Sequence, residues 1–594
     1  MCRKRLIQLA GLSLLGIAVL ILRLAQIQLF ETESFSKRNI NLIQESVNQR
    51  TQTVILDHGR GKFYDRDGRL INYETVPTLV LFPFLKNMNW DSKKVAEIIG
   101  IPEEELLGAV KRAKEPIVYG NENPLVLTQE QMDAINSLEI PGVFAVNRQM
   151  DKREPLASQL IGLIRENPEE AMKRYPDKAL PQNVLIGITG LEKSFDEFLL
   201  QEEMSKLVFH VDGKGGPLFG INVKYIDSSS PFYPVKVKTT LDLDIQEAVE
   251  KIVDIHGVKK GGLVLLDIAS NSILALVSRP KVDLADPYKN EGAKNFMITS
   301  SIPGSIFKTV IAAAAIERDL ITPGRFFDCS QTIHGEEDEI FEHGIYDFTT
   351  SFAASCNYTF GTLARELARI APEEIENYAG KLGLLSTVGW QGRVFHYSNF
   401  RQLADEEEGQ VFFNEEERYD SNYVAQAGLG QQSVRITPLQ AANMMATIAR
   451  GGQKEMVRAV SAIEYKNGST MYRFPQEKLE GESISPYTAM KLQRLLREVV
   501  VNPNGTGRAL KDLPYSVAGK SGTAQNPSDQ ETKENEDKAN EKLNRWFVGY
   551  FPFEQPKYAL AVVNLDVTGN GGSAIPIFQD MVKFLYEYDH RGQD

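Results

Sequence analysis

The first strong pattern along the chain is a run of apolar residues near its amino terminus. Residues 6–22 are apolar except for the polar Gln8 and Ser13, Arg23 interrupts the run, and an apolar tail follows. A run of this length is at the short end of what a membrane-spanning helix needs, but the long side chain of Arg23 can reach the membrane surface and extend the span. The alternative is a cleaved secretion signal, yet no small-residue cleavage site follows the run. The pattern therefore predicts an uncleaved anchor helix over residues 6–29.

Basic residues set the expected orientation of this anchor. Arg3, Lys4 and Arg5 precede the apolar run. Positive charges beside an anchor stay preferentially on the cytoplasmic side of the membrane. We therefore expect a single-pass protein of the cell membrane, with a cytoplasmic tail over residues 1–5 and everything after about residue 30 on the extracytoplasmic side.

The next two hundred residues alternate short apolar and polar stretches. This pattern predicts strands and helices in turn, with strands at 54–56 and 78–82 and helices at 91–99, 127–138 and 192–202. Asp65 to Gly68 read DRDG and suggest a calcium loop, but Arg69 takes the place of a third ligand, so we expect a charged hairpin turn instead. Gly-rich and Ser-rich segments at 213–220 and 228–230 indicate a domain boundary.

The remainder of the chain begins and ends with strands and is rich in helices between them. A helix at 244–253 precedes two apolar strands that a short turn joins into a hairpin, and two further strands precede a last helix; these elements are at 261–268, 272–278, 545–552, 558–563 and 577–588. Thr437 and Pro438 are typical of a helix start, and Gly451 of its end. Residues 526–544 are almost wholly polar and predict a solvated loop between two strands. We therefore expect an α+β domain whose sheet is built from both ends of its sequence.

Bulk composition narrows the classes of function. The chain has 594 residues, too many for one compact core, and its net charge of −13 argues against nucleic-acid binding. Its three cysteines, Cys2, Cys329 and Cys356, do not make a disulfide framework, and none belongs to a C-x-x-C pair. No His-Glu motif of a metalloenzyme accompanies the seven histidines, so we expect neither a metal site nor a cofactor.

The stretch SIPGSIFKTV at 301–310 carries the first candidate chemistry. Pro303 and Gly304 break any helix or strand that precedes them, so we expect a new helix to begin at Ser305. Lys308 would then lie one turn later on the same face of that helix. A serine hydroxyl is a poor nucleophile unless a base takes its proton, and a lysine is such a base only when neutral. Its ordinary pKa of about 10.4 must then fall by roughly three units, which corresponds to about 4 kcal/mol. Desolvation by the apolar neighbours and the positive end of a helix both act in that direction.

Two later motifs strengthen this interpretation, because an isolated S-x-x-K is far more often surface sequence. Ser355-Cys356-Asn357 supplies a second hydroxyl with an amide, and Lys520-Ser521-Gly522 supplies a second lysine beside hydroxyls. Each alone also fits a structural role, the first as a helix terminus and the second as a strand that ends in a turn. Together they form an ordered set of a nucleophile, its base and two supporting clusters.

The motifs S-x-x-K, S-x-N and K-[ST]-G in this order resemble those of penicillin-binding proteins and class A β-lactamases. The chain resembles the class B penicillin-binding proteins, the monofunctional transpeptidases of the bacterial cell wall. Further blocks follow the family order along essentially the whole chain: DRDGRLI, GITGLEKSFDEFL, TTLDLDIQ, PGSIFK, FDC, SCN, GLGQ with TPLQAA, KSGTAQ and WFVGYFP. Two departures are mild: Cys356 is in the middle of S-x-N, and Ser521 replaces the Thr of K-T-G.

This resemblance implies a fold and a division of the chain. It implies an anchor helix at 6–29, an elongated α/β pedestal of the dimerisation type at 30–232, and a serine transpeptidase domain at 233–594. In the last domain a central antiparallel five-stranded sheet is flanked by helices, as in β-lactamases.

The resemblance also implies a role for each motif residue. Ser305 would attack the carbonyl between two terminal D-alanines of a peptidoglycan stem peptide, and Lys308 would accept its proton. Ser355 would pass a proton to the leaving nitrogen, a step that Lys520 tunes. Asn357 would bind the amide of the donor peptide. Ser521, Gly522 and Thr523 would bind the substrate with its carboxylate. The backbone N–H groups of Ser305 and Thr523 would form the oxyanion hole.

The family also suggests partners and leaves alternatives open. Expected partners are the donor stem peptide, an acceptor amine, β-lactams as inhibitors and a separate membrane glycosyltransferase. A β-lactamase or β-lactam sensor of the same fold would need an E-x-x-L-N segment after S-x-N to hydrolyse its acyl-enzyme, and none lies between Asn357 and Lys520. The segment 335–344 nearly imitates a glycosyltransferase motif, but its Phe341 and His343 are one residue too close. A non-catalytic scaffold for wall synthesis is a third alternative, which intact Ser305 and both motif lysines argue against.

Overall fold

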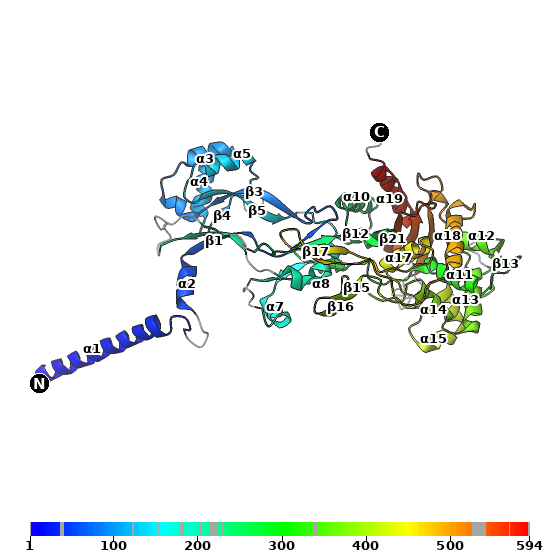
Figure 1. Cartoon of the computed structure of the whole chain (residues 1–594), viewed down its shortest axis with the longest axis horizontal. Helices are drawn as coiled ribbons and strands as arrows, with labels where there is room; N and C mark the ends of the chain where they lie inside the picture. Colours follow the sequence, from blue (N-terminus) through cyan, green and yellow to red (C-terminus); the bar gives the residue numbers. More distant parts are fainter. Residues whose placement is uncertain are drawn as a thin grey trace. The chain divides into compact units, whose positions relative to one another are not determined.

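The structure is a computed structural model, and its contacts divide the chain into two compact units (Figure 1). It describes residues 2–35, 41–120, 124–152, 154–178, 180, 183–200, 204–212, 224–226, 230–337, 343–525, 542–569 and 571–591. The first unit contains Met1–Gly59, Tyr73–Asp151 and Glu203–Ser229, and the second contains Arg60–Asn72, Lys152–Glu202 and Ser230–Asp594. The domain limits given above stay a prediction. The predicted boundary segment 213–220 lies outside the described residues, as do 228 and 229.

A long apolar helix begins the chain. Helix α1 (Cys2–Ala25) continues through Arg23 into a π-helical turn, η1 (Gln26–Phe30), and Ile7–Phe30 is long and apolar enough to cross a membrane. Its apolar side chains are exposed. The guanidinium of Arg23 donates to Gln26 Oε1 at 2.6 Å. The structure therefore extends the helix beyond Arg23, as the predicted span over residues 6–29 requires.

Two small sheets and a group of helices make up the rest of the first unit. The strands run in the orders β1-β8-β9 and β4-β3-β5, and all paired neighbours are antiparallel. The predicted strands at 54–56 and 78–82 and the predicted helices at 91–99 and 127–138 are confirmed as β1, β3, α3 and α5. The bounds are α2 Leu42–Gln49, β1 Thr51–Asp57, β3 Tyr73–Leu81, η2 Pro83–Asn87, α3 Ser92–Ile99, α4 Glu103–Arg112, β4 Ile117–Val118, α5 Gln129–Asn136, β5 Val143–Asp151, β8 Ser205–His210 and β9 Lys224–Ile226.

The second unit takes in short elements from the first third of the chain. The DRDG stretch is a hairpin turn, as predicted: Asp65 accepts from the backbone of Asp67 and Arg69, and Arg69 Nε donates to its carboxylate at 2.7 Å. The single helix predicted over 192–202 is wrong. Two short helices meet there at Phe195, because buried Glu192 and Asp196 both turn toward Arg60. The bounds are β2 Lys62–Tyr64, α6 Ser158–Ile161, β6 Ile164–Glu166, α7 Pro168–Arg174, β7 Leu185–Gly187, α8 Gly190–Ser194 and α9 Asp196–Leu199.

The centre of the second unit is a five-stranded antiparallel sheet in the order β12-β11-β21-β20-β19. Its strands are β11 Gly261–Asp267, β12 Ser272–Arg279, β19 Ala518–Gln525, β20 Lys542–Phe551 and β21 Tyr558–Thr568. Strands from both ends of the domain sequence therefore share one sheet, which confirms the predicted α+β class. The loop predicted at 526–544 is too long, because β20 begins at Lys542, and residues 526–541 lie outside the described part of the chain.

Helices cover both faces of this sheet, which explains why strands β11, β12 and β21 are buried along almost their whole length. On β21, Ala559, Ala561 and Val563 pack in the core that contains α11 and α17. Leu560 and Val562, which point the opposite way, pack in the core that contains α10 and α19. Strand β19 forms one edge of the sheet and pairs with β20 alone among the described strands.

Further helices and small sheets surround this centre. Helix α17 begins as predicted, with a capping box between Thr437 and Gln440 and Pro438 at its first position. The remaining bounds are β10 Lys236–Thr239, α10 Leu243–Ile255, η3 Lys289–Glu291, η4 Gly304–Ile306, α11 Lys308–Glu317, β13 Phe326–Asp328, β14 Ile345–Asp347, α12 Phe348–Ala354, α13 Asn357–Ile370, α14 Glu374–Lys381, β15 Gln391–Val394, β16 Tyr397–Arg401, α15 Glu415–Tyr419, α16 Ser421–Gly428, α17 Pro438–Ala449, β17 Val460–Glu464, β18 Thr470–Arg473, α18 Pro486–Val501, η5 Arg508–Leu510 and α19 Ala574–Asp589.

Candidate active site

Ser305 lies in a tight turn that touches the edge strand β19. The turn is the 3₁₀ segment η4, and the α-helix begins only at Lys308, so the expectation that the helix starts at Ser305 is wrong. Gly304 has φ +57°, and a Cβ there would lie 2.2 Å from the carbonyl oxygen of Thr523. Only glycine permits this approach. The close contact forces the tighter turn and brings Ser305 beside β19.

Two more contacts fix the turn against the sheet. A Cβ at Gly522 would lie 2.5 Å from the carbonyl oxygen of Pro303, so this part of β19 must also be glycine. Trp546 on β20 is buried and donates its indole N–H to the carbonyl oxygen of Ile302 at 3.0 Å. The segment that carries Ser305 is therefore held from both sides, by backbone contact and by a buried hydrogen bond.

Lys308 is fully buried one turn after Ser305, among the buried side chains of Ile306, Phe307 and Val310. Its Nζ donates to the carbonyl oxygen of Ser355 at 2.6 Å and to Asn357 Oδ1 at 2.7 Å, and it lies 3.2 Å from Ser355 Oγ. Burial, and then the nearby Lys520, lower the pKa of Lys308 well below its ordinary value.

The Ser-Cys-Asn motif lies at the junction of two helices. Ser355 ends α12 in the left-handed conformation, with φ +61°, and Cys356 caps α13, which begins at Asn357. This reversal between the helices brings both Ser355 and Asn357 within hydrogen-bond distance of the Lys308 amine. The helix-terminus interpretation of S-x-N is therefore confirmed, and the functional interpretation stays a prediction.

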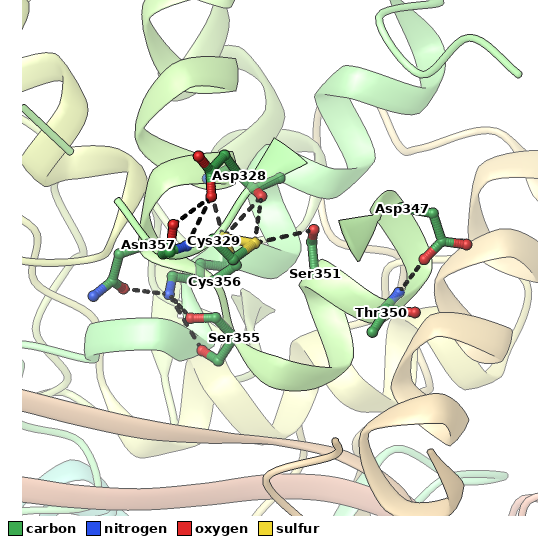
Figure 2. Close-up of a disulfide and its surroundings, with 11 residues drawn as sticks. Asp328, Cys329, Asp347, Thr350, Ser351, Ser355, Cys356 and Asn357 are labelled. Atoms are coloured by element: carbon green, nitrogen blue, oxygen red, sulfur yellow. Dashed lines mark hydrogen bonds between the residues drawn. A yellow bond between two sulfur atoms is a disulfide. The ribbon is translucent and has the colours of Figure 1, made fainter. Parts of the chain in front are cut away.

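Cys329 and Cys356 form a disulfide, which the sequence interpretation missed (Figure 2). The bond ties the end of β13 to the middle residue of the Ser-Cys-Asn motif. Thr359 donates from its hydroxyl to Cys356 Sγ at 3.0 Å and from its backbone N–H at 3.5 Å. The disulfide thus holds the segment from which Ser355 and Asn357 reach Lys308.

Lys520 lies on β19, fully buried, and joins the same cluster. Its Nζ donates to Ser355 Oγ at 2.9 Å, so Ser355 stands between the two lysine amines. Burial lowers the pKa of Lys520 to about 7. The three motifs therefore converge on one hydroxyl, that of Ser355.

An open pocket of about 430 Å³ lies against this cluster. The hydroxyl of Ser305 makes no hydrogen bond with another described residue and faces the pocket. The lining residues are mostly polar: Ser305, Cys329, Gln331, His343, Ala354, Ser355, Asn357, Gln426, Leu429, Gln431, Thr506, Ser521, Thr523, Gln525 and Leu543. Five of the predicted site residues line the pocket: Ser305, Ser355, Asn357, Ser521 and Thr523. The other three, Lys308, Lys520 and Gly522, are not among its lining residues.

Comparison with known proteins decides the family. Residues 261–583, more than half of the chain, match the model of the penicillin-binding protein transpeptidase domain. The chain belongs to this family. Residues 56–223 match the penicillin-binding protein dimerisation domain.

Among similar proteins, the peptidoglycan D,D-transpeptidase MrdA of Haemophilus influenzae is 23% identical over 98% of this chain and 91% of its own length. Stage V sporulation protein D of Bacillus subtilis is 25% identical over 85% of this chain and 73% of its own length. A chain from a solved peptidoglycan synthase complex has a TM-score of 0.64 at 21% identity and covers 99% of both chains. The penicillin-binding protein PBP2 of Helicobacter pylori, solved in complex with MreC, has a TM-score of 0.57 at 17% identity over 91% of this chain and all of that one. These structures share the fold of this penicillin-binding protein.

Three residues that line the pocket of this penicillin-binding protein or lie beside it were not singled out from the sequence. Gln431 Nε2 donates to the carbonyl oxygen of Thr523 at 3.2 Å, and its only sequence signal was the block GLGQ. Arg545 on β20 donates to Thr523 Oγ1 at 3.4 Å and places a positive charge beside that hydroxyl. Thr506 accepts from Ser521 Oγ at 2.7 Å and had no signal in any quoted motif. Contacts between segments this distant are decided by packing.

Proposed function

We propose that this penicillin-binding protein is a serine D,D-transpeptidase that cross-links peptidoglycan stem peptides through an acyl-enzyme and is acylated by β-lactams. One observation carries the proposal. A buried lysine amine, one turn from an available serine hydroxyl, is hydrogen-bonded to the Ser-Cys-Asn motif, and that motif is hydrogen-bonded in turn to a second buried lysine. The geometry supports nucleophilic acyl transfer.

In the first step Ser305 Oγ attacks the carbonyl between two D-alanines while Lys308 takes its proton. A neutral lysine amine keeps two N–H donors, which suffice for its two shortest bonds, to the Ser355 carbonyl oxygen and to Asn357. Its lone pair then remains for the proton of Ser305. The lowered pKa of Lys308 supports this role, because the neutral form must be populated near neutral pH.

The same proton then leaves with the departing amine. When the C–N bond breaks, the leaving D-alanine nitrogen needs one proton, and Lys308 holds the one it took from Ser305. Ser355 Oγ lies 3.2 Å from Lys308 Nζ and accepts from Lys520 at 2.9 Å, so it provides a path from the amine to the leaving nitrogen. Lys520 would tune that transfer through its charge. An amine from a neighbouring stem then attacks the ester and releases Ser305.

The edge of β19 supports an oxyanion hole. In an antiparallel strand one residue directs its N–H and its C=O to the same side. The carbonyl oxygen of Thr523 accepts from Gln431 and lies close to Gly304, so both backbone groups of Thr523 are on the outer edge. We assign its N–H, together with that of Ser305, to the developing oxyanion, where each such donor contributes about 3–4 kcal/mol.

The polar wall of the pocket supports recognition of the substrate carboxylate. Ser521 and Thr523 alternate on β19 and both line the pocket, while Gly522 between them packs against the turn of Ser305. A carboxylate accepts up to four hydrogen bonds and has no donor, which matches a wall of hydroxyls. Arg545, bonded to Thr523, adds the favourable charge. Asn357 is left to bind the donor amide.

The expected location and partners belong to the same proposal. The apolar helix α1 supports a single-pass membrane anchor. The basic residues at its start, and the Cys329–Cys356 disulfide, support a cytoplasmic amino terminus and an extracytoplasmic second unit, because positive charges stay on the cytoplasmic side and disulfides persist in oxidising compartments. We propose a membrane glycosyltransferase as the partner that supplies uncross-linked glycan.

The test is covalent labelling of the detergent-purified full chain by a fluorescent penicillin. Wild type is expected to carry one stable label, and Ser305→Ala none. Ser34→Ala is the matched control, because Ser34 begins another S-x-x-K match of this chain, and it should label as wild type does. A label that survives Ser305→Ala would refute the assignment. Rapid release of hydrolysed penicillin would favour the β-lactamase alternative, and no labelling of wild type would favour the scaffold.

A further inference from the structure

A third hydroxyl stands beside the two that the motif supplies. Ser521 and Thr523 come from the K-S-G-T stretch of β19, whereas Thr506 comes from the loop after α18. All three line the pocket. Ser521 Oγ donates to Thr506 Oγ1 at 2.7 Å, which is the usual length of a hydroxyl–hydroxyl bond.

The backbone of Thr506 fixes where this hydroxyl lies. Its N–H donates to the carbonyl oxygen of Ala353 at 3.1 Å, two residues before Ser355. Ala353 belongs to the buried last turn of α12. Thr506 is therefore tied by its backbone to the helix end that presents Ser355, and by its side chain to the strand that presents Lys520.

The hydrogen bond between Ser521 and Thr506 must change when an anion binds. A serine hydroxyl has one proton and two lone pairs, and in the structure Ser521 donates its proton to Thr506. A carboxylate only accepts, so Ser521 must turn its proton to the ligand. Its lone pairs are then free to accept, and the proton of Thr506, which has no partner among the described residues, is the nearest donor. The bond between the two hydroxyls reverses.

We propose that Thr506 is a positioning residue of the carboxylate subsite, which holds Ser521 Oγ at the pocket wall and donates to it once Ser521 donates to the ligand. The inference rests on the proposed function, since it requires that Ser521 binds the substrate carboxylate. A donor behind Ser521 makes its own O–H a stronger donor, because hydrogen bonds in a chain polarise one another. Thr506 itself touches neither the nucleophile nor the scissile bond.

The experiment compares benzylpenicillin with its methyl ester, which lacks the negative carboxylate. Thr506→Val keeps the shape of the side chain and removes only the hydroxyl. Because one neutral hydrogen bond is at stake, the second-order acylation constant should fall about fivefold for benzylpenicillin and change less than about twofold for the ester. Thr506→Ser restores the hydroxyl and should return the constant for benzylpenicillin to within about twofold of wild type. Thr470→Val, at an exposed threonine of β18, is the matched control and should change neither constant.

A double-mutant cycle separates positioning from packing. In a Ser521→Ala background the Thr506→Val change should lose its effect, because the hydroxyl it acts through is gone. An equal loss for penicillin and ester, or a loss that persists in that background, would overturn the inference and leave Thr506 as a packing residue. An unchanged constant in Thr506→Val would also overturn it. Failure of the proposed function looks different, because wild type itself would then form no label at Ser305.

Discussion

Replacing Lys520 by methionine is expected to move the pH dependence of acylation toward higher pH. In the proposed mechanism the acid limb of that dependence reports the conversion of Lys308 from ammonium to neutral amine. Burial is the larger cause of the lowered pKa of Lys308, and the nearby Lys520 is the second. Below the pKa of Lys520, about 7, that second amine is a cation. Methionine keeps the length of the side chain and removes the charge, so the pKa of Lys308 should rise.

The geometry bounds the size of the change. Ser355 Oγ lies 3.2 Å from one amine and 2.9 Å from the other, so the two nitrogens are at most about 6 Å apart. Two unit charges at about 6 Å interact by roughly 3 kcal/mol at an effective dielectric constant of about 20, which corresponds to about 2 pKa units. We therefore expect the midpoint of the acid limb to rise by about 1–2 units. It should stay below the ordinary lysine value, because Lys308 remains buried.

The assay is the second-order rate of labelling by a fluorescent penicillin, measured from pH 5 to pH 10 and scaled to its own plateau for each variant. Scaling removes the expected loss of plateau rate, since Lys520 also contacts Ser355. Lys511→Met, at an exposed lysine of the same unit, is the matched control and should leave the midpoint in place. A midpoint in Lys520→Met that stays with the control, or moves to lower pH, would refute the electrostatic account of Lys308.

Two further predictions concern the scaffold of the site. Gly304→Ala places a methyl group 2.2 Å from the carbonyl oxygen of Thr523, so penicillin labelling should fall by at least tenfold and the melting temperature should drop. The control is Gly324→Ala, at a glycine that also has a positive φ but has open space around it; this variant should lose only about 1 kcal/mol of stability and keep its labelling. Equal behaviour of the two variants would argue against a clash at Gly304. Reducing the Cys329–Cys356 disulfide, which spans 27 residues, should lower the free energy of unfolding by about 3.5 kcal/mol. The measurement is the melting temperature of the wild type with and without reductant. An equal melting temperature after the bond has been reduced would show that it adds no stability.

The candidate catalytic motifs could be located in the sequence because the residues of each motif are neighbours along the chain. Ser305 and Lys308 are one turn apart in a 3₁₀ or an α-helical backbone alike, so the error about the helix start left their relation intact. The error itself has a tertiary cause, since the tight turn is imposed by the contact of Gly304 with β19. The broken helix at Phe195 has a similar origin, in the burial of two carboxylates around one arginine.

The disulfide and Thr506 show where prediction from the sequence stops. Cys329 and Cys356 follow no spacing that identifies a pair, and only the fold brings them within bonding distance. Thr506 lies in no motif, and its hydroxyl meets that of Ser521 because the loop after α18 packs on the end of α12. Sequence patterns do not show which distant residues come into contact, because those contacts form only when the helices and strands pack together.

The sequence by itself determined the alternation of apolar strands and helices, the long apolar helix at the amino terminus, and the three short motifs, because each of these depends on residues within a few positions of one another and on the periods of helix and strand. Only the tertiary structure decided that the three motifs meet at Ser355 and that the side chains of Lys308 and Lys520 are both buried. It also decided that a disulfide holds the Ser-Cys-Asn segment, which contacts both lysines. The physical reason is that a lowered lysine pKa is a property of surroundings, supplied here by side chains from distant parts of the chain that packing alone brings together.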